Sequence, residues 1–226
     1  MKELVSFKFN QAGIIHNLTL DAISKLPNFP NISNEESYYM GIKVVNSIFN
    51  YHCNDVKYPS YSEIEPYYNL IKGDDSYIVI INELLKNGII SEELAEEMKY
   101  HYNNLIVVDN YDKLQKEVLN FIKHFKANSK LSEIEVIICW YCASVTMFSY
   151  NYWNDVEFNP ENPWYSIYHK NDKTKTKGKF WHIVGVIAAD CAGALVGGAA
   201  GSVFGPTGAA YCGAAAAGAA SKVAAG

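Results

Sequence analysis

Two cysteines lie three positions apart in an apolar stretch, Cys139-Trp-Tyr-Cys142. This is the spacing of redox dithiols and of half a zinc site. A redox cysteine obtains its low pKa near a helix N-terminus, whereas Cys139 follows the expected helix start at Ser132 by seven residues. No second CxxC or HxxxH follows to complete a zinc site. We therefore expect two small core residues, and neither a metal nor a cofactor.

The histidines show no metal-ligand spacing, and no Ser or Cys stands in a nucleophile-elbow context. A phosphate-binding glycine loop is also missing from the sequence. His16 and Asn17 favour a structural pair that caps a helix or bridges between helices. The sequence offers no catalytic residue, so we expect a protein that is not an enzyme, and an enzyme remains the third alternative.

The elements that carry these residues are predicted to be helices. Hydrophobic residues make up 49% of the 226 positions, which is enough for a packed core. Apolar residues recur every three or four positions, which indicates an all-α, multi-helix bundle. The stretch Val136 to Phe148 is apolar nearly all round, which favours a central helix of the bundle, with a membrane segment as the alternative. A short strand is expected at Leu4 to Phe9, and helices at Gln11 to Lys25, Asn34 to Tyr51, Tyr61 to Ile71, Asp75 to Lys86, Glu92 to Leu105, Tyr111 to Ala127 and Ser132 to Tyr152.

Several helix ends are marked by local signals. Ser132 and Glu135 form a capping-box pattern, and Ser91 precedes two acidic residues as an N-cap. Gly88 suits a left-handed helix stop. These signals predict where three of the helices begin or end.

Composition and charge divide the chain into three parts. We expect a helical body over residues 1–155, an irregular segment with a lysine-rich linker over 156–180, and a Gly/Ala-rich helical hairpin over 181–226. In the last part, 26 of 46 positions are Gly or Ala, and Asp190 and Lys222 are its two charged residues. Lysine supplies every basic residue and the net charge is -5, which argues against nucleic-acid binding.

The linker carries four lysines at alternate positions. They would contact anionic lipid headgroups beside an inserting segment, or form a solvated tether. Charged residues at Glu3 and Lys8 interrupt any apolar run at the N-terminus, so no secretory signal is expected. Five cysteines suit a reducing compartment. We expect synthesis in the cytoplasm, with export by a dedicated route or membrane association. The four linker lysines are Lys173, Lys175, Lys177 and Lys179.

Small residues recur every fourth position on both arms of the expected hairpin. Glycine costs a helix about 1 kcal/mol relative to Ala, so a regular row indicates that another backbone approaches closely. A turn at Pro206 and Thr207 sets Gly201 opposite Cys212 and brings Asp190 level with Lys222, which predicts a buried charge pair. The same register sets Gly197 opposite Ala216 and keeps Cys191 and Cys212 too far apart for a disulfide. The rows are Gly185, Ala189, Gly193, Gly197, Gly201 and Gly205, and then Ala209, Gly213, Ala217, Ser221 and Ala225.

The run Gly193-x-x-x-Gly197-x-x-x-Gly201-x-x-x-Gly205 resembles the glycine zippers of bacteriocin-type and other membrane-active bacterial proteins. The resemblance covers Ile183 to Ala224, and we identify no family for residues 1–168. It implies a toxin-like or pore-forming protein whose hairpin inserts into membranes and self-associates, with anionic lipid and further copies of the chain as partners. We then expect Gly197→Leu to abolish vesicle leakage while the body stays folded.

The arms are marginal as membrane spans. The eight strongly apolar residues of the first arm contribute about -0.3 to -0.6 kcal/mol each, and Asp190 costs up to about +3 kcal/mol. The second arm is about 23 Å long against a hydrocarbon core of ~30 Å. The alternative is a soluble interaction or assembly module whose hairpin packs on its own body, on a second copy or on a protein partner.

Overall fold

The computed structural model describes residues 2–49, 58–71, 76–170 and 179–225, and within these ranges every regular element is a helix. This confirms the all-α prediction. The helices are α1 (Lys2–Ser24), α2 (Asn34–Phe49), α3 (Tyr61–Tyr68), α4 (Ser76–Lys86), α5 (Glu92–Leu105), α6 (Tyr111–Ala127), α7 (Glu133–Phe158), α8 (Tyr165–Lys170), α9 (Lys179–Gly201), the 3-10 turn η2 (Ser202–Phe204) and α10 (Gly205–Ala225).

Local signals set the helix ends. The Ser132 and Glu135 side chains form the predicted capping box at the start of α7, and Ser91 accepts from the Leu94 N–H at the start of α5. Gly88 has φ = 66° after α4 and is the left-handed stop. The strand expected at Leu4 to Phe9 is wrong, since α1 already begins at Lys2. Extending a helix adds one hydrogen bond per residue, so a short apolar run beside a stable helix continues it.

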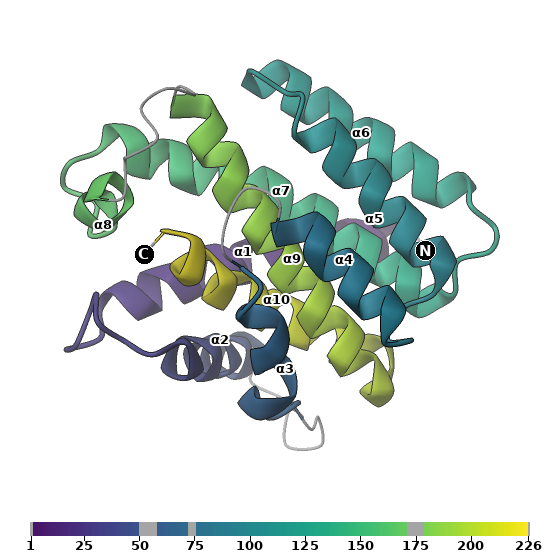
Figure 1. The fold of residues 1–226 in the computed structure, drawn as a ribbon, viewed down its shortest axis with the longest axis horizontal. Helices are drawn as coiled ribbons and strands as arrows, with labels where there is room; N and C mark the ends of the chain where they lie inside the picture. Colours follow the sequence, from purple (N-terminus) through teal and green to yellow (C-terminus); the bar gives the residue numbers. More distant parts are fainter. Residues whose placement is uncertain (1, 50–57, 72–75, 171–178, 226) are drawn as a thin grey trace.

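The hairpin of α9 and α10 lies inside the bundle. In Figure 1, α9 crosses the middle of the molecule, with α4, α5 and α6 on one side and α1, α2 and α10 on the other. Contacts join α10 to α1, α2 and α7, and join α9 to α7 and α4. One hydrophobic core contains residues of both the body and the hairpin. The expected body and hairpin are therefore packed as a single unit.

Both hairpin helices are enclosed. Residues 186–199 of α9 and Cys212 to Ser221 of α10 are all buried. In α7 the residues from Ile138 to Thr146 are buried except for the half-buried Trp140, which agrees with the prediction of a central apolar helix. One helix among the described residues is long and apolar enough to cross a membrane, Phe180–Gly201, which has a mean hydropathy of 1.9 and is 89% buried over its most apolar 18 residues. The core helix of a soluble protein passes the same test, so this property does not by itself indicate a membrane.

Candidate functional site

The two hairpin helices touch each other through the predicted glycines. A Cβ built at Gly197 would lie 2.5 Å from the Ala216 Cβ, and one built at Gly201 would lie 2.7 Å from the Cys212 Cβ. Cβ atoms do not approach this closely, so only glycine fits at these positions. The pairs Gly197 with Ala216 and Gly201 with Cys212 are those of the predicted register. Cys191 and Cys212 are both free thiols, as expected.

Small residues also bring the body close to α10. A Cβ at Gly41 in α2 would lie 2.9 Å from the Ala215 Cα, and one at Gly218 would lie 2.7 Å from the Thr19 Cβ in α1. The hairpin is therefore packed closely on several sides, and the body uses the same kind of contact as the hairpin. Two further glycines of the predicted rows lie in the same contact, since Gly193 faces Ala216 and Ala220, and Gly213 faces Ala194. Of the other predicted positions, Ala189 and Ala217 are buried, Gly185 is half-buried and Gly205 begins α10.

A buried polar cluster lies where the hairpin meets the body. Asp190 of α9 is fully buried, and its carboxylate accepts from the hydroxyls of Ser149 in α7 and Ser221 in α10. The His16 Nε2 of α1 lies 3.0 Å from Asp190 Oδ2 and 2.9 Å from Ser221 Oγ. Four helices thus meet at one carboxylate, and all four side chains are 0% exposed.

Hydrogen bonds hold the cluster together. The His16 Nδ1 lies 2.8 Å from Asn17 Oδ1, so both ring nitrogens have polar partners. A buried carboxylate needs hydrogen-bond donors, and two serine hydroxyls and the His16 ring surround that of Asp190. His16 thus bridges α1 to α9 and α10, as predicted, and Asn17 lies against its ring.

The same geometry differs from that of a serine nucleophile. In a catalytic triad the serine and the carboxylate lie on opposite ring nitrogens. Here Ser221 and Asp190 share Nε2, while Nδ1 faces Asn17. The Ser221 hydroxyl donates to Asp190 and is fully buried, so the cluster has the geometry of a structural contact between helices.

The predicted pair of Asp190 and Lys222 is not formed. Lys222 lies one residue after Ser221, so its side chain leaves α10 about 100° further round the helix. Its Nζ lies 3.2 Å from Asn34 Oδ1 at the start of α2. The predicted register is therefore correct along the helix axis, but Ser221, and not Lys222, faces Asp190. Residues 171–178 lie outside the described residues, and with them Lys173, Lys175 and Lys177, while Lys179 begins α9.

Two further polar residues support the hairpin. The Tyr68 hydroxyl of α3 donates to the Ala216 carbonyl of α10 at 2.6 Å. Burial, with smaller contributions from Tyr38, Tyr61 and Asp190, raises the pKa of Tyr68, so this hydroxyl keeps its proton. The Thr146 hydroxyl of α7 lies 3.1 Å from Cys191 Sγ of α9.

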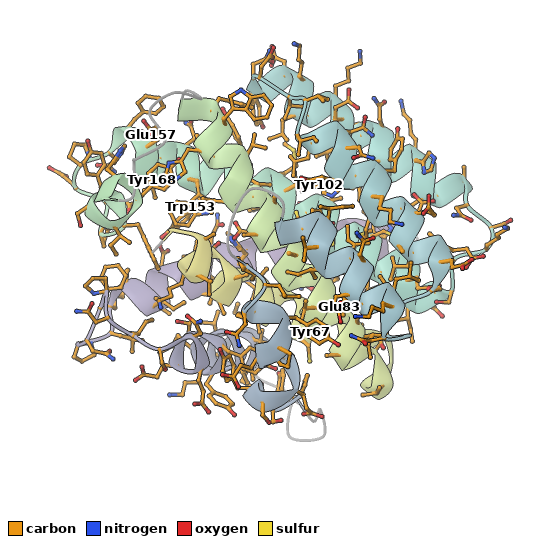
Figure 2. All side chains as sticks on the ribbon, viewed as in Figure 1. Tyr67, Glu83, Tyr102, Trp153, Glu157 and Tyr168 are labelled. Carbon is orange, nitrogen blue, oxygen red and sulfur yellow. The ribbon has the colours of Figure 1, made fainter. Side chains whose placement is uncertain are left out.

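An aromatic stack joins α7 and α8 to the start of the hairpin. Figure 2 shows Trp153, Glu157 and Tyr168 close together where α7 ends beside α8. The Tyr168 ring stacks on Trp153 with centroids 5.5 Å apart and on His182 of α9 at 4.0 Å. Glu157 is buried and faces His169 at 3.8 Å. The stack fixes the base of α9 against the body.

The cysteines of the CxxC spacing are core residues. Cys139 and Cys142 are fully buried in α7. Burial raises the pKa of the Cys142 thiol to about 12 and also raises that of Cys139. No group of three potential metal ligands occurs among the residues that the structure describes. A cavity of about 220 Å³ lies near the far end of α9, between Ile89, Leu94, Ile138 and Ser202.

Comparison with known proteins gives no relative. No protein-family model, no curated protein and no solved structure matches the chain.

Sequence reasoning missed Ser149 and the role of Ser221. The sequence places Ser221 in the small-residue row, and Ser149 lies close to the apolar stretch of α7 without a distinguishing neighbour. A polar residue in each of two apolar helices, together with a lone aspartate, was the available signal. This signal indicates that a buried aspartate needs hydrogen-bond donors, but it does not indicate which donors lie close enough to it.

Proposed function

We propose that the protein is membrane-active and that the structure is its sheltered state, in which the body covers an apolar hairpin. The observation that supports this most directly is the position of the hairpin. Helices α9 and α10 pack on each other almost backbone to backbone, and the body encloses them. Since their mutual contacts involve no body residue, the pair can move as a unit.

The favourable and unfavourable contributions to the insertion of α9 into lipid nearly cancel. The apolar residues of α9 favour lipid by about -0.3 to -0.6 kcal/mol each, and Asp190 opposes insertion by about +2.5 to +3.5 kcal/mol. Small-residue faces drive helix association in lipid, so further copies of the hairpin would add the missing stabilisation. The lysine-rich linker before α9 would contact anionic headgroups. A hairpin of this kind inserts only when its contacts with a membrane or with a further copy of the hairpin are more favourable than its contacts with the body.

A disulfide between hairpin and body tests this proposal. A Cβ at Gly198 in α9 would lie 3.1 Å from the Ile138 Cγ1 in α7. The Ile138 side chain thus points at the place that a side chain at position 198 would occupy, as a disulfide between the two positions requires. The variant Ile138→Cys/Gly198→Cys is mixed with dye-loaded anionic vesicles in its oxidised and its reduced form. We expect dye release from the reduced protein and none from the oxidised protein.

The matched control is Ile138→Cys alone, which keeps the native thiols but cannot form the tether. It should release dye under both conditions. Equal release from the oxidised and reduced double variant would contradict insertion of the hairpin. No release from the wild type or from any variant, at any lipid composition, would contradict membrane activity itself.

The second candidate is a soluble interaction or assembly module whose hairpin is a permanent core. The complete burial of α10 from Cys212 to Ser221 favours it, because removing α10 would open the core of the body. Cosedimentation with anionic vesicles separates the two candidates. Binding that high salt abolishes supports the lysine linker and the membrane proposal. Absence of binding at every salt concentration supports the soluble module.

A further inference from the structure

We propose that the contacts within the buried cluster of His16, Ser149, Asp190 and Ser221 hold the hairpin inside the body. We call this cluster the catch. The inference rests on the proposed function and names the contact that regulates it. His16 and Ser149 belong to the body, on α1 and α7, and Asp190 and Ser221 belong to the hairpin, on α9 and α10. The four side chains are completely buried and meet at one carboxylate.

The polar cluster has an effect that the apolar contacts do not have. Lipid tails are as apolar as a leucine side chain, so moving an apolar helix face from the protein core into a bilayer changes its free energy little. A carboxylate that loses its donors in the same transfer becomes strongly unfavourable. The balance between sheltered and inserted states therefore depends mainly on the polar contacts that insertion breaks.

Asp190 acts on both sides of that balance. In the body its oxygens accept from His16 and from both serines. In the bilayer the separation of α9 from α1 and α7 leaves Ser221 as its remaining partner in the cluster. Asp190 is the single acidic residue of segment 181–226, so the sequence places its charge where it stabilises the sheltered state and opposes the inserted one.

The variant Asp190→Asn shifts the balance toward the inserted state in two ways. The amide has one acceptor oxygen in place of two and carries no negative charge, so its hydrogen bonds with His16 and the serines are weaker and the sheltered state is less stable. The amide is also uncharged, so the inserted state is relieved of the aspartate penalty. We expect half-maximal dye release from anionic vesicles at a protein concentration at least about tenfold lower than for the wild type.

His16→Gln separates the two effects. It removes the ring that holds Asp190 but leaves the carboxylate on the hairpin. We expect it to lower the urea midpoint of unfolding and to increase dye release less than Asp190→Asn does. The matched control is Asp21→Asn, which makes the same chemical change in a contact within the body, where Asp21 of α1 accepts from the Tyr152 hydroxyl of α7 at 3.0 Å. Asp21→Asn should leave the release curve unchanged.

The disulfide between hairpin and body distinguishes a freed hairpin from an unfolded protein. The Asp190→Asn change is made in the Ile138→Cys/Gly198→Cys protein, and release is measured before and after reduction. Release only after reduction shows that the active species is a freed hairpin. Release from the oxidised form would mean that the variant acts by unfolding, and would overturn the catch. Ser149→Ala, a smaller change at the same carboxylate, should give an intermediate increase.

The outcomes separate the two proposals. Wild-type release with no increase for Asp190→Asn, or with the same increase for Asp21→Asn, overturns the catch and leaves the membrane proposal standing. No release from any protein, including Asp190→Asn, overturns both. A graded increase from wild type through His16→Gln to Asp190→Asn supports both.

Discussion

His101 should make the stability of the protein fall steeply in mild acid. The ring lies in α5 and is 3% exposed. Its Nε2 lies 3.1 Å from Thr146 Oγ1, and its Nδ1 lies 3.4 Å from the Tyr77 hydroxyl. Because Thr146 donates to the Cys142 carbonyl, its oxygen accepts from Nε2–H. The Tyr77 hydroxyl donates to Met98 Sδ at 3.2 Å. A second proton on His101 would therefore place a positive charge on a ring that is buried in the core.

The size and sign of the effect follow from the pKa. Burial lowers the pKa of His101 from 6.5 to about 3. The unfolded chain therefore binds more protons than the folded one between pH 6.5 and about 3, and stability falls as the pH drops through this window. At pH 5 the folded ring is still neutral, so the loss is about 1.5 pH units times ~1.4 kcal/mol, or about 2 kcal/mol relative to pH 8.

Urea unfolding at pH 8 and pH 5 measures this loss. His101→Gln keeps a polar side chain but removes the titrating group. We expect its loss of unfolding free energy between the two pH values to be about 2 kcal/mol smaller than that of the wild type. Thr146→Val is the matched control, because it changes the same contact and retains the imidazole. It should keep the full pH dependence. Equal losses for wild type and His101→Gln would refute the reasoning.

Three further outcomes follow from the packing, the caps and the thiols. Gly197→Leu should lower the unfolding free energy of the whole protein by about 3 kcal/mol or more, because its side chain would meet Cys212 and Ala216 in the core, whereas Gly88→Ala in open space should cost only about 1 to 2 kcal/mol; equal urea midpoints would contradict the packing. Ser132→Ala should cost about 1 kcal/mol in a thermal melt through loss of the capping box, while Ser202→Ala, outside any N-cap, should cost less. In a Cys53→Ser background the four buried thiols should react with an aromatic disulfide reagent only in denaturant, and rapid reaction of the folded protein would contradict their burial.

The packing around Gly197 makes a substitution there a test of folding as well as of membrane activity. The sequence alone suggested that Gly197→Leu would silence the hairpin and spare the body. Since the body and α10 share one core, the substitution tests folding as much as membrane activity. A reversible tether avoids this problem, because the oxidised and reduced proteins have the same sequence.

The sequence predicted those features that depend on local chemistry. Helix periodicity, the cap at Ser132 and the stop at Gly88 involve neighbours within a few residues, and they were confirmed. The pairing of the two arms was also predictable, although the turn expected at Pro206 and Thr207 is wrong. The chain reverses at η2 (Ser202–Phe204), and Pro206 and Thr207 lie in the first turn of α10, where proline is tolerated. The facing of Gly197 and Ala216 confirms the pairing.

The partners of Asp190 could not be predicted in this way. His16 is 174 positions away in the chain and Ser149 is 41 positions away. Their approach depends on how α1 and α7 pack on the hairpin, which no local pattern determines. A row of small residues indicates that some helix approaches closely, but Gly218 faces Thr19 of α1 while Gly197 faces α10. Small residues therefore allow close contact with both the hairpin and the body. The wrong partner for Asp190 came from pairing it with Lys222, the charged residue level with it on the other arm.

The most direct test of the account is the distance between the hairpin and the body in the presence of a membrane. Val203 at the hairpin tip is 76% exposed and Leu119 on α6 is 52% exposed, so cysteines at both positions can carry a dye pair with little disturbance. We expect one fixed energy-transfer efficiency in solution, and a clear fall in efficiency when anionic vesicles are added. An unchanged efficiency in vesicle-bound protein would show that α9 and α10 stay inside the body, and would contradict the account.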